Sequence, residues 1–355
     1  MNLINKKKGG TNKQLKLAIC YSPFQAFIWT KIAKQKNITD AKVLYISYHD
    51  TKKDRYYVGQ LQKSFESVEY FVVNKKRLWI SVPELNRRLQ NLQVSCEKKV
   101  DLYLASFNTF FSMYIFNKFD SASIFLFDDG VFSMLSKEDR KAYRFNTNAM
   151  GFIRKIITKI YLSKIDDQEI LKRVDKFYTL FPSDQTLVDK SKVEPVKISC
   201  DVNSGQKLES YVATQVNVFI GDVPSEFTSR LRDDYRNLLH VLPIDYYLMH
   251  PRSKETCCPQ GKEILPDMVA EDFIASMLSS GKHVTVYSLS SSVLFTMADH
   301  PYLTKIIIRH SDVSLPSLYE KSSSYGIQVM DYDYLIKNAE SMCTKFETSA
   351  TGQPA

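Results

Sequence analysis

Short apolar runs alternate with helix-like segments along most of this chain. Each run has the length of one buried strand, and the segments between the runs carry helix signals. One helix is predicted to begin at Pro23, because proline suits the first turn of a helix. Another is predicted to begin at Ser81-Val82-Pro83-Glu84, which has the form of a capping box. This alternation favours an α/β fold with mostly parallel sheets flanked by helices.

The alternation occurs twice, on either side of a polar stretch at residues 183–215. We therefore predict two Rossmann-like, doubly wound domains with a ligand in the cleft between them. The predicted parts are an N-terminal domain at 1–190, a linker at 191–215, a C-terminal domain at 216–345 and a disordered tail at 346–355. The runs predicted as strands are 16–21, 42–47, 68–73, 101–105, 123–127, 176–181, 216–220, 246–249, 283–287, 305–308 and 327–330.

Composition and charge restrict the kind of protein. The 355 residues are 44% hydrophobic and 25% charged, which is typical of a globular protein and enough for two domains. The net charge of +9 favours an anionic partner, but no zinc-finger spacing, aromatic-glycine RNA signature or basic heptad region favours nucleic acid. The six cysteines lack metal-ligand spacing and suggest reduced thiols. Without a signal peptide or a membrane-spanning segment, we expect a cytoplasmic protein.

Two carboxylates and a glycine follow the apolar run at 123–127. Asp128, Asp129 and Gly130 stand at the strand end, where parallel α/β sheets bind ligands. A carboxylate there can take a proton from a hydroxyl held in the cleft. The same residues are also common in turns, and aspartate caps helices. A metal site is the third option, although adjacent side chains on an extended segment diverge and make a poor pair of ligands.

A histidine and three serines follow two later strands. His250 and Pro251 come directly after one predicted strand, where a histidine can donate a hydrogen bond or a proton to a departing phosphate. A solvated histidine is the simpler alternative. Ser290, Ser291 and Ser292 follow another strand and precede a helix-like segment, which suits an anion, although serine also simply caps helices. The chain has no glycine-rich Walker or dinucleotide loop, so ATPase and dehydrogenase functions lose support.

The stretch at 151–165 has the pattern of a basic amphipathic helix. Such a helix can lie on an anionic membrane surface, or it can be an ordinary surface helix packed on the core. Its apolar face would hold Ile153, Ile156, Ile157, Ile160 and Tyr161, and its basic residues are Arg154, Lys155, Lys159 and Lys164.

With these motifs the chain resembles the bacterial sialyltransferases, and among them glycosyltransferase family 52, the lipooligosaccharide sialyltransferase group. The shared features, in chain order, are an acidic-acidic-glycine motif, a His-Pro motif and a Ser-Ser motif. The opening Cys20-Tyr21-Ser22-Pro23-Phe24-Gln25 is similar to the first strand–helix turn of that group, and Asp128-Asp129-Gly130 with Ser133 is similar to its acidic motif.

The resemblance implies a GT-B fold and an inverting, metal-independent transfer of sialic acid from CMP-sialic acid, with no cofactor. Asp129, or else Asp128, would be the general base, and His250 would assist the leaving phosphate. The donor-binding residues that the resemblance implies are Ser291, Ser292, Ser290, Glu271 (or its neighbour Asp272) for the ribose, Pro251 and Gly130; those implied on the acceptor side are Ser22, Pro23, Gln25 and Ser133. The three consecutive serines leave the phosphate-binding pair open by one position.

The acceptor implied is a galactose-terminated bacterial surface glycan, such as a lipooligosaccharide, O-antigen or capsule. One alternative is another GT-B transferase that uses CMP-Kdo or a different nucleotide sugar. A second is a non-catalytic glycan- or lipid-binding protein, which the intact acidic, His-Pro and Ser-Ser set disfavours. We expect no nucleic-acid partner, and weak association with the inner face of the bacterial inner membrane is one option. Oligomeric state, with a homodimer as one option, and linkage stay open.

Overall fold

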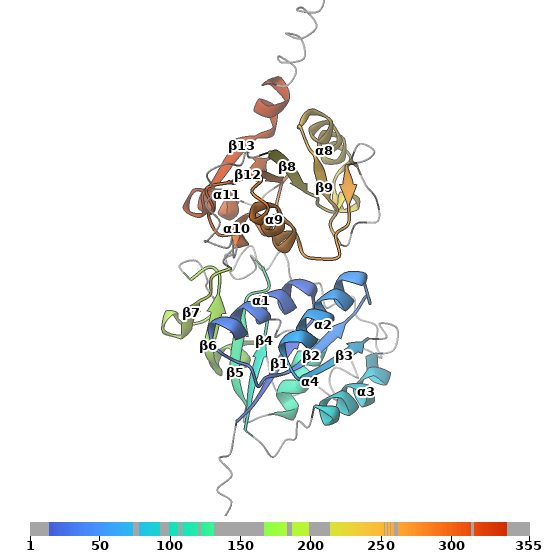
Figure 1. Ribbon diagram of the computed structural model, residues 1–355, viewed down its shortest axis with the longest axis vertical. Coiled ribbons are helices and arrows are strands. Elements are labelled where there is room, and N and C mark those ends of the chain that lie inside the picture. The colour runs from blue at the N-terminus through green and yellow to red at the C-terminus, as the bar shows by residue number, and fades with distance from the viewer. Residues whose placement is uncertain are drawn as a thin grey trace, which may run out of the picture. The chain divides into compact units, whose positions relative to one another are not determined.

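The computed structural model in Figure 1 divides into two compact units. The first unit comprises residues 1–129 and 143–196, and the second comprises residues 130–142 and 197–355. The structure describes residues 14–73, 78–92, 99–105, 107, 109–119, 122–130, 167–182, 187–198, 214–251, 253, 255, 257–258, 262–313 and 316–338.

A parallel sheet of seven strands forms the centre of the first unit, in the order β3-β2-β1-β4-β5-β6-β7. The order reverses between β1 and β4, and such a switch point is where ligands bind to α/β sheets. The strands are β1 Leu15–Cys20, β2 Lys42–Ser47, β3 Ser67–Val72, β4 Val100–Leu104, β5 Ser123–Phe127, β6 Val174–Thr179 and β7 Val193–Pro195. The helical elements are α1 Pro23–Gln35, α2 Lys52–Ser64, α3 Leu78–Asn91, α4 Phe110–Lys118, α7 Asp167–Lys172 and the 3-10 turn η3 Lys190–Lys192.

Both faces of the first sheet are buried. Successive side chains of a strand point to opposite faces, so Leu102 and Leu104 of β4 enter the core that α3 and α4 cover. Tyr103, between them, packs on the other face against Trp29 of α1, with ring centroids 4.9 Å apart. Figure 1 shows α1 and α2 side by side over this sheet. The central strands of this sheet are therefore rich in apolar residues on both faces, as in other parallel sheets.

The second unit contains a parallel sheet of six strands in the order β10-β9-β8-β11-β12-β13. Its switch point lies between β8 and β11. The strands are β8 Gln215–Ile220, β9 Tyr246–Leu248, β10 Glu263–Ile264, β11 His283–Ser288, β12 Leu303–Arg309 and β13 Ile327–Asp331. The helical elements are α8 Ser229–Val241, α9 Ala270–Ser279, α10 Val293–Thr296, α11 Pro316–Ser322 and the 3-10 turns η4 Pro224–Glu226 and η5 Ser323–Tyr325.

Aromatic packing fastens α8 to the second sheet. Phe219 of β8 stacks on Tyr247 of β9, with ring centroids 6.0 Å apart, and meets Tyr235 of α8 edge-on at 5.6 Å. All three side chains are almost fully buried, and offset or edge-to-face aromatic pairs add to the free energy gained by burying their area. This cluster lies directly beneath the end of β8, where the loop of the candidate site begins.

The predicted α/β class with two doubly wound sheets is confirmed, and every run predicted as a strand coincides with a strand of the structure. The strands β7 and β10 were not predicted, because strands of three and two residues are too short to show a pattern. β7 lies within the stretch predicted as a linker and is the edge strand of the first sheet. The arrangement of the two sheets around a central cleft stays a prediction, and the tail at 346–355 lies outside the described residues.

The predicted start of a helix at Ser81 is wrong. The helix α3 already includes Leu78, so Ser81 and Pro83 lie inside it. The carboxylate of Glu84 does not reach back to cap the helix, because it pairs forward with Arg87 at 2.6 Å and with Arg88 at 2.7 Å. The helix predicted to begin at Pro23 is confirmed, with proline at its first position.

Candidate active site

The first unit brings two sequence motifs to one edge of its sheet. Ser22 follows β1 and Asp128 follows β5, and both strands pair with β4, which lies between them. Because all three strands are parallel, their carboxyl ends lie at the same edge. The residues proposed for the acceptor side and the proposed general base therefore share the edge at which α/β sheets bind ligands.

Ser22, Pro23 and Gln25 build the start of α1. Ser22 Oγ accepts a hydrogen bond from the backbone N–H of Gln25 at 3.2 Å. The side-chain Oε1 of Gln25 accepts one from the backbone N–H of Tyr21 at 2.7 Å. Serine and glutamine thus satisfy N–H groups at the helix start in a reciprocal pair. Gln25 is 2% exposed, so its visible role is to hold the strand–helix turn.

Asp128 and Asp129 are adjacent but have different surroundings. Asp128 is 1% exposed, and its Oδ2 accepts a hydrogen bond from the backbone N–H of Leu180. Asp129 is exposed. Gly130 then turns the chain with a φ of 82°, in the left-handed region that favours glycine. A general base must reach the hydroxyl of its substrate, so Asp129 is the better placed of the two carboxylates.

The second unit assembles the His-Pro and serine motifs in the same way. His250 follows β9, and Ser290 follows β11, with β8 between these two strands. His250 is half-buried, and its carbonyl oxygen accepts a hydrogen bond from the backbone N–H of Ser253 at 2.9 Å. Pro251 is exposed in the same turn. The two motifs therefore lie at the carboxyl ends of strands that flank β8.

The serine loop is the segment from Ser288 to Ser292. Buried Ser288 anchors it, because its Oγ accepts hydrogen bonds from the backbone N–H groups of Ser290 at 3.3 Å and Ser291 at 3.0 Å. Ser291 Oγ accepts a bond from the N–H of Val293 at 3.3 Å, which leaves its hydroxyl proton for another acceptor. Ser292 stands at the cap of α10 without a side-chain capping bond. The α10 helix has only four residues, so serine hydroxyls rather than a long helix dipole would bind an anion here.

Asp222 contacts the serine loop, and it was not among the site residues predicted from the sequence. It follows β8, and its Oδ1 accepts a hydrogen bond from Ser290 Oγ at 2.6 Å. Its backbone N–H donates to Tyr235 Oη at 3.1 Å. Gly221 lets the loop pass this closely, since a Cβ on it would lie 2.5 Å from Tyr247 Oη. The one sequence feature that could have identified Asp222 is its position directly after an apolar run and Gly221.

Glu271 lies in the first turn of α9 and is 3% exposed. Its Oε1 accepts a hydrogen bond from Thr296 Oγ1 at 2.8 Å, which ties α9 to α10 beside the serine loop. Its neighbour Asp272 is half-buried. Glu271 therefore has a visible role in placing the serine loop, and the ribose contact of either acidic residue stays a prediction.

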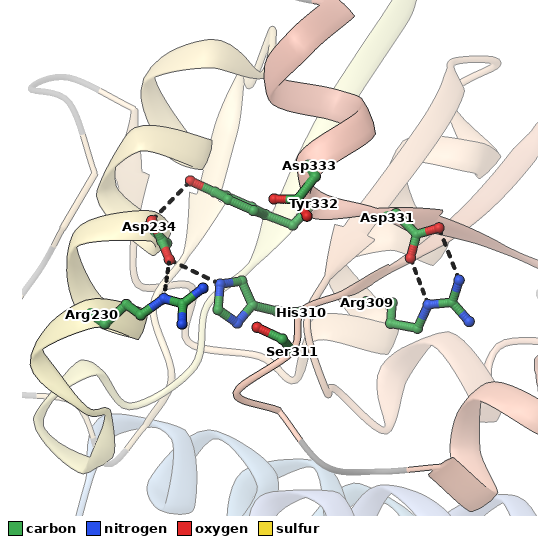
Figure 2. Close-up of a pocket in the computed structure, with 8 residues that line it drawn as sticks. All are labelled: Arg230, Asp234, Arg309, His310, Ser311, Asp331, Tyr332 and Asp333. Atoms are coloured by element: carbon green, nitrogen blue, oxygen red, sulfur yellow. Dashed lines mark hydrogen bonds and ion pairs between the residues drawn. The ribbon is translucent and has the colours of Figure 1, made fainter.

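A separate cavity of about 380 Å³ lies at the ends of β12 and β13, next to α8 (Figure 2). Asp234 lines this cavity and accepts hydrogen bonds from His310 Nε2 at 3.1 Å and from Tyr332 Oη at 3.2 Å. His310 Nδ1 accepts a bond from the backbone N–H of Asp312 at 3.1 Å, so both ring nitrogens are engaged. Arg309 pairs with Asp331 through two bonds. We read this cluster as structural, because its central groups already satisfy one another.

Two features predicted from the sequence cannot be placed in the structure. Ser133 and the basic stretch at 151–165 lie outside the described residues. Within the described ranges, no three His, Cys, Asp or Glu side chains gather as a metal site would require. In the same part of the chain, no helix is both long and apolar enough to cross a bilayer.

Comparison with known proteins shows the family of this chain. Residues 39–312 match Glycosyltransferase family 52, and this match covers most of the sequence. The chain belongs to that family. It is 22% identical over 321 residues to an N-acetyllactosaminide alpha-2,3-sialyltransferase of Haemophilus influenzae, covering 89% of this chain and 99% of the relative. It is also 22% identical over 329 residues to the Neisseria meningitidis protein of the same name, covering 89% of this chain and 85% of that one.

Solved structures of low sequence identity also superimpose on most of this chain. The spinosyn rhamnosyltransferase SpnG superimposes with a TM-score of 0.49 at 10% identity, covering 93% of this chain and 92% of that one. TcCGT1 in complex with UDP gives a TM-score of 0.46 at 11% identity, covering 92% and 90%.

Proposed function

We propose that this protein is an inverting α-2,3-sialyltransferase that moves sialic acid from CMP-sialic acid to a galactose-terminated glycan. Membership of glycosyltransferase family 52 is the observation that carries the proposal. The two relatives named as N-acetyllactosaminide alpha-2,3-sialyltransferases support the sialyl group, the acceptor and the linkage. The placement of the acidic, His-Pro and serine motifs at the carboxyl edges of their sheets is consistent with it.

In the proposed mechanism Asp129 removes the proton of the acceptor hydroxyl. The acceptor oxygen then attacks the anomeric carbon of sialic acid on the face opposite the phosphate, and the bond from that carbon to the phosphate oxygen breaks. The anomeric configuration is therefore inverted. CMP is a good leaving group, so positioning and charge neutralisation supply most of the catalysis.

The second unit would hold CMP as it leaves. His250 donates a hydrogen bond or a proton to the departing phosphate oxygen, and Ser291 and Ser292 donate their hydroxyls to the other phosphate oxygens. Their geometry supports this, since Ser291 Oγ is already an acceptor for Val293 and Ser292 makes no capping bond. Glu271 or Asp272 accepts a hydroxyl of the ribose. The proposal needs no metal ion, because the chain's own donors balance the phosphate charge.

Transfer with defined substrates tests the proposal. The purified protein is incubated with N-acetyllactosamine and, in separate reactions, with CMP-sialic acid, CMP-Kdo, UDP-galactose and GDP-mannose. We expect a product that carries one sialic acid, formed only from CMP-sialic acid and cleaved by a sialidase specific for α-2,3 linkages. Transfer from another donor would support a different nucleotide-sugar transferase. Tight glycan binding with no transfer from any donor would support the non-catalytic alternative.

We also propose that the protein works in the cytoplasm, bound weakly to the anionic inner face of the membrane. The support is its net charge of +9 and the basic residues of the stretch at 151–165. Each lysine or arginine near an anionic surface contributes about 1 kcal/mol, and salt screens this attraction. Replacing Arg154, Lys155, Lys159 and Lys164 with Gln should weaken binding to phosphatidylserine vesicles at low salt while sparing transfer to a soluble acceptor. Wild-type protein that ignores such vesicles at low salt would end this idea.

A further inference from the structure

The carboxyl group of Asp222 is built into the serine loop in a way that the proposed chemistry does not use. Its Oδ1 accepts the hydroxyl proton of Ser290 at 2.6 Å. Its Oδ2 is buried and has no hydrogen-bond partner. A buried carboxylate oxygen without a partner is costly, whereas the carbonyl oxygen of a protonated carboxyl carries no charge and costs less. This geometry favours a carboxyl that takes up a proton.

We propose that Asp222 is a positioning residue for donor binding, and that it takes up one proton when the phosphate of the donor binds at the serine loop. This inference rests on the proposed function, because it assumes that the serine loop holds that phosphate. It concerns how Ser290 presents its hydroxyl to the ligand.

The direction of one hydrogen bond links the two events. While Asp222 is ionised, the Ser290 hydroxyl donates its single proton to Asp222 Oδ1. It can then present only lone pairs to a phosphate oxygen. Once Asp222 is protonated, it donates to Ser290 Oγ, and the Ser290 hydroxyl turns its proton to the phosphate. One proton enters from solvent, and no covalent bond of the ligand changes. Ser290 thereby joins Ser291 and Ser292 as a phosphate donor.

The surroundings of Asp222 favour the protonated form once an anion arrives. Burial raises the pKa of Asp222 to about 6, although the hydrogen bond from Ser290 and the nearby backbone of Leu289 oppose this rise. The titratable groups that face it are tyrosines: Tyr235 of α8, Tyr247 of β9 and, farther away, Tyr319 of α11. No basic side chain contributes to the pKa of Asp222 among the described residues. A phosphate next to Ser290 adds negative charge and raises that pKa further.

The test measures binding of cytidine 5′-phosphate methyl ester by calorimetry from pH 5 to pH 8. This probe is a phosphodiester, so the charge of its phosphate is constant over the range. For wild type we expect the Kd to rise about twofold from pH 5 to pH 6 and about tenfold from pH 7 to pH 8. Titrations at pH 7.5 in two buffers of different ionisation heat should show uptake of close to one proton per site.

Two variants isolate Asp222. The Asp222→Asn protein should take up about one proton fewer per site than wild type at pH 7.5, and its Kd should lose the tenfold rise between pH 7 and pH 8, because its amide donates permanently to Ser290. Any pH dependence left in this variant belongs to His250, which meets the same phosphate in the proposed mechanism. The Ser290→Ala protein should bind weakly at every pH and should lose the proton uptake. Asp233→Asn is the matched control, since Asp233 lies on the exposed side of α8 and pairs with Arg236; it should keep the wild-type pH profile.

The outcomes separate the inference from the function. If wild type binds the ester with one Kd across the range, or if Asp222→Asn takes up as many protons per site as wild type, the inference is overturned while sialyl transfer stands. If Asp222→Asn loses transfer but keeps the wild-type pH profile of binding, Asp222 acts at the acceptor, and the inference that it takes up a proton on donor binding is also overturned. If neither CMP nor the ester binds at any pH and no transfer occurs, the proposed function and this inference fall together.

Discussion

The carboxylate of Asp128 holds the backbone N–H of Leu180, and through this bond it joins the end of β5 to the end of β6. The neighbouring Asp129 is exposed at the same edge. The two adjacent aspartates therefore differ: Asp128 fixes the loop, and the side chain of Asp129 is exposed on it. We therefore expect both carboxylates of the acidic motif to matter, Asp128 for the loop and Asp129 for the acceptor.

Replacing Asp128 with alanine should lower stability. The variant leaves the N–H of Leu180 without its acceptor, which costs about 1–3 kcal/mol. For a unit of this size we expect the melting temperature to fall by about 2–10 °C. Asp128→Asn keeps an acceptor oxygen and should lose much less, and Asp175→Ala, an exposed aspartate on β6, serves as the control. Equal melting temperatures for Asp128→Ala and wild type would mean that this bond contributes nothing.

Replacing Asp129 with asparagine should remove transfer while leaving the fold and CMP binding intact. General-base catalysis contributes about 100- to 10,000-fold, so the turnover number should fall by that factor. Initial rates of sialyl transfer to N-acetyllactosamine measure the loss, and calorimetry with CMP measures binding. A folded Asp129→Asn protein with full activity would exclude Asp129 as the base.

More of the fold than of the candidate site could be predicted from the sequence. Buried parallel strands such as β5 are continuous apolar runs, and these are visible without a structure. The roles of Asp128 and Asp222 were not visible, because each depends on a partner far along the chain: Leu180 for one and Ser290 for the other. Glu84 shows the same limit. It pairs with Arg87 and Arg88, which follow it in the chain, and therefore does not form the capping box predicted with Ser81.

Chelation should leave transfer largely intact. The proposed mechanism balances the phosphate charge with His250 and the hydroxyls of the serine loop, so a divalent ion has no necessary role. We expect at least about half of the initial rate to remain after dialysis against EDTA, which is a change of less than 0.5 kcal/mol in the activation free energy. Loss of all transfer, restored by magnesium or manganese, would instead make Asp128 and Asp129 metal ligands.

The stability of the ligand-free protein should depend on pH through Asp222. Burial raises the pKa of this carboxyl from 3.8 to about 6 in the folded state. Between these two values the folded protein holds a proton that the unfolded chain has released, so stability falls as the pH rises from about 4 to about 6. Above pH 6 the buried charge of Asp222 lowers the free energy of unfolding by about 3 kcal/mol, which corresponds to a difference of about two pKa units. Below pH 4 this loss of stability vanishes.

Asp222→Asn removes this cost, because an amide has no proton to lose and can still bond to Ser290. Its melting temperature relative to wild type should therefore rise steadily from pH 4 to pH 7 and stay constant above. Thermal unfolding followed by circular dichroism in steps of one pH unit measures the difference, with Asp233→Asn as the exposed control whose difference stays flat. A difference for Asp222→Asn that is the same at pH 4 and pH 8 would mean that Asp222 titrates alike in the folded and unfolded chains, and the cost of its buried charge would then be absent.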